Sequence, residues 1–177
     1  MHRLTALIAT CLVALPGVAR AAEPPCLTGS EFASLAGYSL PSVISGTTQR
    51  CNANLGADAY LKRNGMQLAA RYAERKAANW PGAKAAFMKL SATKNEDANK
   101  LLSTMPDPSL QQMIDAVMEG MVSQQIPPEQ CGVIDNVVRL LAPLPPANTA
   151  ELIALAVGLG AKSGKGKVGS ITLCPVQ

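Results

Sequence analysis

The sequence predicts an all-α fold: a compact bundle of six or seven short helices braced by two disulfides. Apolar residues recur at three- and four-residue intervals along most of the chain, which is the spacing of one helix face. Aromatic residues are scarce, so small and unbranched side chains must fill the core, and these suit close helix packing better than a sheet. Cys26, Cys51, Cys131 and Cys174 form an even set, as a disulfide framework does.

Residues 1–21 have the pattern of a cleaved signal peptide. A positively charged start precedes an apolar run over 4–18, which is too short to span a bilayer. Ala19-Arg20-Ala21 then supplies the small-x-small pattern that precedes cleavage. We expect an exported chain whose residues 22–177 form a single helical domain.

The leader also contains Cys11, which raises the alternative of a lipid anchor. Thr10 before it is a poor lipidation residue, and little apolar sequence precedes it, so we expect Cys11 to be discarded with the leader. The alanine-rich chain without an Asn-x-Ser/Thr acceptor favours the bacterial periplasm over the extracellular space.

The N-terminal part of the domain predicts two short helices. Thr28-Gly-Ser-Glu31 has the spacing of a capping box, and the helix that it opens should end near Gly37. Ser39-Leu-Pro41 places proline in the first turn of a second helix, which should run towards Cys51.

A longer helix is predicted over residues 57–79. Gly65 lies on its apolar stripe and is expected to permit a close helix crossing. Trp80-Pro81-Gly82 predicts a corner before the next helix, and Thr93-Lys-Asn-Glu96 is a second capping box, where that helix should break and restart.

Residues 109–126 have the clearest helical pattern, with Asp107 as the expected N-cap. The polar face of this helix carries Asp115 and Glu119, which we expect to be a solvated pair. Its apolar stripe consists of Leu110, Met113, Ile114, Val117, Met118, Met121 and Val122.

The C-terminal part predicts a helix containing Cys131, a rigid connector over 143–146 and a last helix over 149–159. Residues 161–170, rich in glycine, lysine and serine, predict a flexible loop. The last segment, 171–174, is expected to be extended and held by its cysteine.

The four cysteines allow three connectivities, and the sequence does not choose among them. Local closure, with Cys26 bound to Cys51 and Cys131 bound to Cys174, is the simplest interpretation. A four-thiolate metal site is the alternative, but the spacings lack the close cysteine pairs that such sites use.

Composition excludes several classes of function. The only histidine, His2, lies in the leader, so the mature chain has no Ser-His-Asp or Cys-His nucleophile and no His-ligated metal. No cofactor is expected. Gly158–Lys165 superficially resembles a phosphate-binding loop, but its spacing is one residue too long and Gly166 stands where the hydroxyl is needed.

Charge is low overall but unevenly placed. The formal charge of +4 falls to about +2 when Arg3 and Arg20 leave with the signal peptide. Region 62–100 is basic and the following sixty or so residues are acidic. The favoured interpretation is two faces that attract each other within the domain. The alternative is a basic face, Lys62–Lys100, that weakly contacts a membrane surface, a wall polymer or an acidic partner. Nucleic acid is not expected, because no basic tract is interleaved with aromatic residues.

These observations favour a non-enzymatic exported domain that binds a protein partner, of inhibitor, immunity, chaperone or accessory-subunit type. The first alternative is a carrier of a small apolar ligand or lipid, in a groove or cavity lined by Met113, Met118 and Met121. The second alternative is a wall-acting hydrolase that uses carboxylates alone. No transmembrane segment is expected in the mature chain.

Overall fold

The computed structural model describes residues 26–162 and 171–174, and within these it confirms the predicted all-α class. This part of the chain forms seven α-helices and one short 3-10 helix, with no strand beyond an isolated bridge. The α-helices are α1 (Gly29–Cys51), α2 (Tyr60–Ala73), α3 (Lys76–Ala92), α4 (Glu96–Thr104), α5 (Asp107–Gln125), α6 (Cys131–Leu141) and α7 (Pro146–Lys162), and the 3-10 helix is η1 (Pro128–Gln130).

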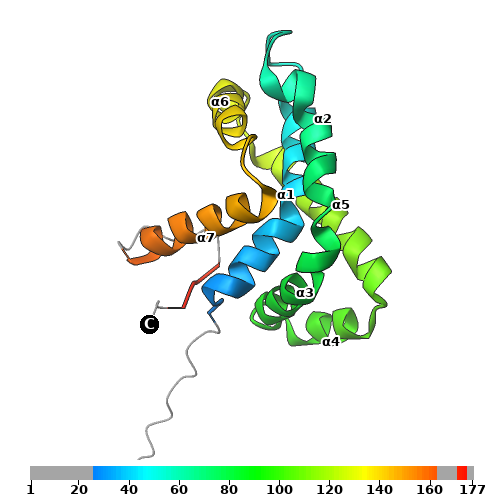
Figure 1. Ribbon diagram of the computed structural model, residues 1–177. Coiled ribbons are helices and arrows are strands. Elements are labelled where there is room, and N and C mark those ends of the chain that lie inside the picture. Colours follow the sequence, from blue (N-terminus) through cyan, green and yellow to red (C-terminus); the bar gives the residue numbers. More distant parts are fainter. Residues whose placement is uncertain (1–25, 163–170, 175–177) are drawn as a thin grey trace, which may run out of the picture.

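Helix α1 is the shared packing partner of the fold. It runs through the middle of the molecule, with α2 to α5 on one side and α6 and α7 leaving on the other (Figure 1). Helices α2, α3, α5 and α7 all pack against α1, whereas contacts among these four helices are few. The buried positions of α1 are mostly small residues, which let several helix backbones approach it.

Two glycines show how closely helices approach one another. A Cβ atom added at Gly46 of α1 would lie 2.8 Å from the carbonyl oxygen of Glu119 in α5. A Cβ atom added at Gly65 of α2 would collide with the side chain of Thr48 in α1. The expectation that Gly65 permits a close helix crossing is therefore confirmed.

The prediction of two helices between residues 29 and 51 was wrong, because α1 is continuous over 23 residues. Pro41 lies in its interior and cannot donate the helical hydrogen bond to the carbonyl of Gly37. Packing of α1 against four other helices outweighs this local loss.

The predicted corner at Trp80-Pro81-Gly82 was also wrong, and the chain turns earlier. Helix α2 ends at Ala73, and α3 begins at Lys76 and continues through Pro81. The buried indole of Trp80 lies 5.1 Å from the ring of Tyr38, measured between centroids, and its Nε1 donates to Asp107 at 2.7 Å. These contacts hold the first turns of α3 in the core, although proline removes one helical hydrogen bond there.

Smaller differences concern the helix ends. The predicted break near residue 95 is present, but Asn95 is the N-cap of α4 and accepts from the Ala98 amide at 3.0 Å. Asp107 is the first residue of α5 rather than its N-cap. Helix α7 begins at Pro146 and includes residues 161–162, and the rest of the predicted loop over 161–170 lies outside the described residues.

The core consists of three clusters, each built around aromatic side chains or the chain ends. One surrounds Tyr38 and Trp80, and a second surrounds Ile44 and Tyr72. The third contains Leu27 and Phe32 and receives the apolar side of α7. The three clusters follow one another along α1, around Phe32, Tyr38 and Ile44 in turn.

Two disulfides are present, Cys26–Cys174 and Cys51–Cys131, so local closure was wrong. The continuous α1 explains why: it places Gly29, three residues after Cys26, roughly 33 Å from Cys51 along the helix axis. The observed bridges close 148 and 80 residues, and loop-closure entropy assigns them about 5 and about 4.5 kcal/mol.

A buried carboxylate, Asp135 of α6, caps the N-terminus of α2. It accepts from the backbone amides of Leu61 at 2.6 Å and Tyr60 at 3.3 Å, whereas the N-cap residue Ala59 has no capping side chain. A negative charge at this end also complements the helix dipole. Asp135 and the Cys51–Cys131 disulfide together hold α6 to the rest of the molecule.

Peptide mapping tests the connectivity. A non-reducing tryptic digest of the mature protein should yield peptide 168–177 linked to the peptide that ends at residue 50. It should also yield peptide 51–62 linked to 101–139, because trypsin separates all four cysteines. A link between Cys26 and Cys51 would contradict the continuous α1.

Replacing the capping carboxylate should destabilise the domain. We expect Asp135→Ala to lower the free energy of unfolding by about 2–3 kcal/mol, since the buried amide of Leu61 and the partly buried amide of Tyr60 lose a charged acceptor. Urea unfolding followed by circular dichroism measures this change. Asn136→Ala, at an exposed neighbour on α6, is the matched control, and an equal effect of both substitutions would contradict the capping role.

Candidate functional site

The three methionines singled out in α5 do not lie together at an open cavity. Met113 and Met118 are partly buried and pack against the Tyr38–Trp80 cluster, whereas Met121 is 47% exposed. None of them lines either of the two cavities described below.

The expected solvated pair of carboxylates on α5 was wrong, because this side of α5 packs on α1. Asp115 accepts from the hydroxyl of Ser42 at 3.3 Å and pairs with the ammonium group of Lys76 at 2.5 Å. Glu119 accepts from Ser45 at 3.3 Å and also from Gln49. Both carboxylates therefore join helices, and neither faces open solvent as a free acid or base.

Lys76 completes a small polar cluster next to the core. Its ammonium nitrogen lies 4.5 Å from the ring centroid of Tyr38, within the range of a cation–π contact. Burial of Tyr38, with a smaller contribution from the Asp115 carboxylate, raises the pKa of its hydroxyl. The tyrosine therefore stays neutral at ordinary pH and acts as a packing residue.

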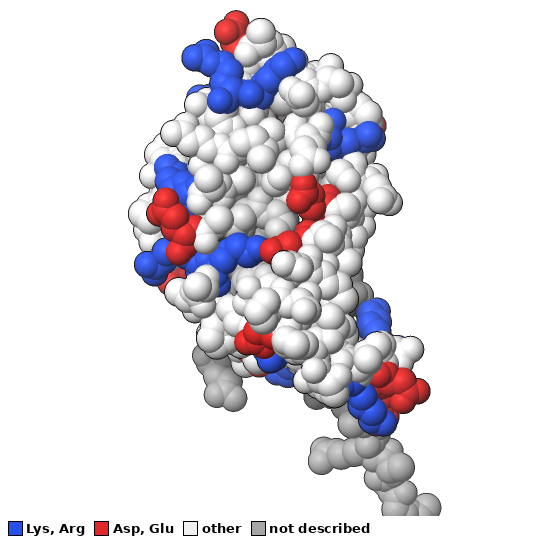
Figure 2. Space-filling model, turned by 90° about the vertical axis from the view of Figure 1, so that its right-hand side faces the viewer, with Lys and Arg blue, Asp and Glu red and all other residues white. Residues whose placement is uncertain are grey.

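Much of the basic region 62–100 pairs with acidic residues of the same chain. Lys84 lies 2.6 Å from Asp107, and Lys89 lies 3.0 Å from Glu31. Blue and red side chains lie next to each other over the face in Figure 2, in pairs and small groups. This agrees with attraction within the domain. Contact of the basic region with a membrane or wall polymer stays a prediction.

A largely apolar cavity lies between the first turns of α1, the length of α7 and the segment 171–174. Its volume is about 620 Å³. Small residues form much of its wall, and two exposed leucines of α7, Leu155 and Leu159, stand at its edge. We call it the α1–α7 groove. Its lining includes Gly29, Ala33 and Ser34 of α1 and Ala150, Glu151, Ala154 and Gly158 of α7.

A second cavity, of about 430 Å³, lies along α2 and has a much more polar lining. It includes Arg71, whose guanidinium group already donates to the carbonyl of Ala142 beyond the end of α6. This arginine satisfies a helix C-terminus, as cations often do. We therefore take the α1–α7 groove as the candidate functional site.

Exposed apolar side chains are concentrated on α7, which lines this groove, and on α6, which precedes it in the chain. Six of the ten large apolar residues that the described chain exposes lie on α6 and α7. They are Val133, Val137, Leu140, Leu152, Leu155 and Leu159. On each helix three of them follow at three- or four-residue intervals and so share one side, and exposed apolar surfaces of this kind mark interaction sites.

One end of the groove is held rigidly by the joined ends of the described chain. Cys174 lines the groove, and its disulfide partner Cys26 lies just before α1. The amide of Leu27 donates to the carbonyl of Thr172 at 2.9 Å, and the amide of Cys174 donates to the carbonyl of Leu27 at 2.9 Å. The wall that 171–174 contributes is thus fixed to α1.

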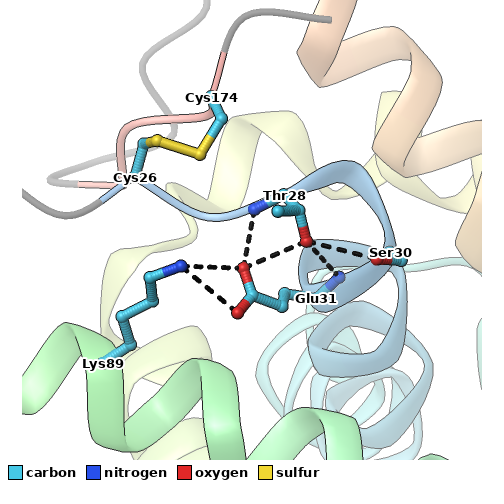
Figure 3. The surroundings of a disulfide bond; sticks show 6 residues. All are labelled: Cys26, Thr28, Ser30, Glu31, Lys89 and Cys174. Atoms are coloured by element: carbon cyan, nitrogen blue, oxygen red, sulfur yellow. Dashed lines mark hydrogen bonds and ion pairs between the residues drawn. A yellow bond between two sulfur atoms is a disulfide. The ribbon is translucent and has the colours of Figure 1, made fainter. Parts of the chain in front are cut away.

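A capping box next to this disulfide fixes the first turn of α1 (Figure 3). The Thr28 hydroxyl accepts from the amide of Glu31 at 3.2 Å, and the Glu31 carboxylate accepts from the amide of Thr28 at 2.7 Å, as the sequence predicted. Lys89 of α3 donates to the same carboxylate at 3.0 Å. These bonds hold the pKa of Glu31 below its ordinary value, chiefly through the Thr28 amide.

Sequence reasoning missed this groove, although α7 carried a signal. Residues 146–160 contain only one charged residue, Glu151, and apolar residues occur on every side of the helix. Only one side, with Ile153 and Val157, packs against Leu27 and Phe32. An apolar helix at the surface therefore leaves a second apolar side unpartnered.

Comparison with known protein families, curated proteins and solved structures finds no match to this chain. Over the described residues, every helix is too short or too polar to cross a membrane. No group of three or more histidine, cysteine, aspartate or glutamate side chains in the same residues is arranged to hold a metal ion.

The capping box gives the domain a defined acid sensitivity. Because folding lowers the pKa of Glu31 from 4.5, its ionised form contributes stability that is fully present above pH 4.5. That contribution is lost as the pH falls through the lower pKa of the folded state. The difference in unfolding free energy between the wild type and Glu31→Gln should therefore shrink as urea titrations move below pH 4.5.

The control is Glu96→Gln on α4, where the glutamate side chain is 80% exposed and pairs only with Lys100. We expect this substitution to change stability by a few tenths of a kcal/mol, roughly the contribution of a surface pair. A difference between wild type and Glu31→Gln that does not depend on pH would contradict the capping geometry.

Proposed function

We propose that this protein is an exported, non-enzymatic domain that binds a protein partner, and that the α1–α7 groove receives an apolar helix of that partner. The observation that carries the proposal is a concave apolar surface beside exposed leucines on a rigidly held frame. Small residues on both walls permit a helix backbone to approach closely. Leu155 and Leu159 would then pack against the side of the partner helix.

The charge of the groove indicates which kind of partner helix would bind there. Glu151 is the charged side chain among the lining residues, and it has no ion-pair partner within the described chain. A helix that fits should therefore be apolar on one face and carry one lysine or arginine at its edge. Such a cation would neutralise Glu151 as the groove loses water.

The contacts of the acidic residues support a non-enzymatic role. Asp115 and Glu119 join α5 to α1, Asp135 caps α2, and Glu31 closes a capping box. Each of these four carboxylates thus has a structural task. A hydrolase that relies on carboxylates alone needs two that face a cleft, one of them with a raised pKa.

We also propose the compartment in which the protein acts. Two disulfides that each close a long stretch of chain are typical of proteins that fold in an oxidising compartment. Together with the leader pattern over 1–21, they favour export. We propose the periplasm of a bacterium as the place of action.

A carrier of a small apolar ligand or lipid is the second candidate. The volume of about 620 Å³ lies within the range of small-molecule sites, and the lining is mostly apolar. The ligand would occupy the α1–α7 groove rather than the cavity once expected beside Met113, Met118 and Met121. Its bound mass would distinguish it from a protein.

Native mass spectrometry of the mature protein, isolated gently from its host envelope, tests both functions. We expect a stoichiometric protein adduct on the wild type, and its loss in Leu155→Asp, because a charge at the groove edge resists desolvation. Leu101→Asp on α4 is the matched control, since Leu101 is 68% exposed and remote in sequence from both walls. An adduct with the mass of a lipid would instead favour the carrier, and an adduct that Leu155→Asp leaves unchanged would contradict the groove.

A further inference from the structure

We propose that the partner is a second copy of this chain, and that α6 of each copy lies in the α1–α7 groove of the other. This inference rests on the proposed function, because it uses the same groove. In this arrangement the exposed stripe of α6, formed by Val133, Val137 and Leu140, packs into the groove of the other copy. The two contacts would be related by a two-fold axis, as in most homodimers.

Helix α6 is built to present this stripe outwards. Val133, Val137 and Leu140 lie at intervals of four and three residues, so they share one side of the helix, and they are 67%, 49% and 67% exposed. The other side is fixed by the Cys51–Cys131 disulfide and by Asp135. The stripe is thus rigidly placed and stays uncovered within the described part of the chain.

The apolar area available for burial favours a contact that uses the exposed side chains of both α6 and α7. The six exposed side chains of α6 and α7 together offer on the order of 600 Å² per copy, and burying them in both copies would remove on the order of 1,200 Å², which is the lower bound for a stable interface. Pairing α7 with α7 alone, or α6 with α6 alone, would bury only about half of that area, the size of a crystal contact.

One charged residue on α6 and one in the groove favour the same arrangement. Arg139 precedes Leu140 on α6 and has no ion-pair partner within the described chain, as is also true of Glu151 in the groove. The proposed groove occupant needs one cation at its edge, and α6 carries one. Placing α6 in the groove of a second copy lets Arg139 reach Glu151 twice per dimer.

The arrangement of the helices permits this exchange. Helices α6 and α7 lie on the same side of α1 (Figure 1). A two-fold axis on that side would therefore bring the α6 of each copy towards the α7 of the other. Both surfaces would then be covered by one interface.

Sedimentation equilibrium of the oxidised mature protein tests the proposal directly. We expect a dimer that Val137→Asp and Leu155→Asp each weaken at least 100-fold, while Leu101→Asp leaves the dissociation constant within about twofold. All three positions are exposed, so the variants should keep the helical circular dichroism of the wild type. A wild-type chain that stays monomeric at 100 μM would overturn the proposal.

Mixing the two defective variants distinguishes reciprocal exchange from other dimers. Val137→Asp retains an intact groove, and Leu155→Asp retains an intact α6. Their mixture should form a one-to-one heterodimer through one intact contact, although neither variant dimerises alone. Pairing of like helices predicts no such complementation, so its absence would overturn the exchange.

Charge reversal tests the pair across the interface. Arg139→Glu and Glu151→Arg should each weaken the dimer about tenfold, or about 1.4 kcal/mol, and the double variant should restore most of the affinity. A double variant as weak as the sum of both singles would contradict the contact.

The failure of this inference can be told from failure of the proposed function. If the wild type is monomeric but its native adduct with a different protein is lost in Leu155→Asp, the groove binds a partner other than a second copy. That outcome overturns the inference and leaves the function standing. If Leu155→Asp changes neither the dimer nor any adduct, both proposals fail.

Discussion

Four helices pack against α1 at the same time, and they can do so because small side chains occupy most of its buried positions. Gly37, Ser39, Ser42, Gly46 and Thr47 are all buried, and none adds much bulk. The backbones of α1 and α5 therefore approach closely enough for serine hydroxyls of α1 to reach carboxylates of α5. The same helix holds the two disulfides apart, because one lies just before its first residue and the other at its last. Packing, polar contacts and covalent bracing thus follow from one uninterrupted segment.

The sequence predicted those features that depend on neighbouring residues. The capping box of Thr28 and Glu31, the break before Glu96 and the helical character of each segment depend on side chains a few positions apart, and the structure confirms them. The internal prolines Pro41 and Pro81 were misleading, because burial of the flanking helix against distant residues outweighs the lost hydrogen bond. The incorrect disulfide connectivity followed directly from the helix break that Pro41 suggested.

The candidate site lay beyond sequence reasoning for a different reason. A helix with apolar residues on all sides, such as α7, has the same pattern whether it is surrounded by its own chain or partly open. Only the arrangement of α1 and α7 reveals that Leu155 and Leu159 stand at the edge of a groove. Asp115 and Glu119 show the converse, since a polar stripe that resembled a solvated face is the side on which α5 meets α1.

The Cys26–Cys174 bridge has a mechanical consequence. It connects residues 148 positions apart, so the folded segment between them is a covalent ring. A force applied to the two chain ends passes through the sulfur–sulfur bond and does not load the helices at all. An unfolding protease that pulls on the chain beyond Cys174 would meet this bridge and would have to pull both cross-linked segments through its pore together. Degradation from the ends should therefore wait for reduction, whereas a cut inside the ring would leave the pieces joined.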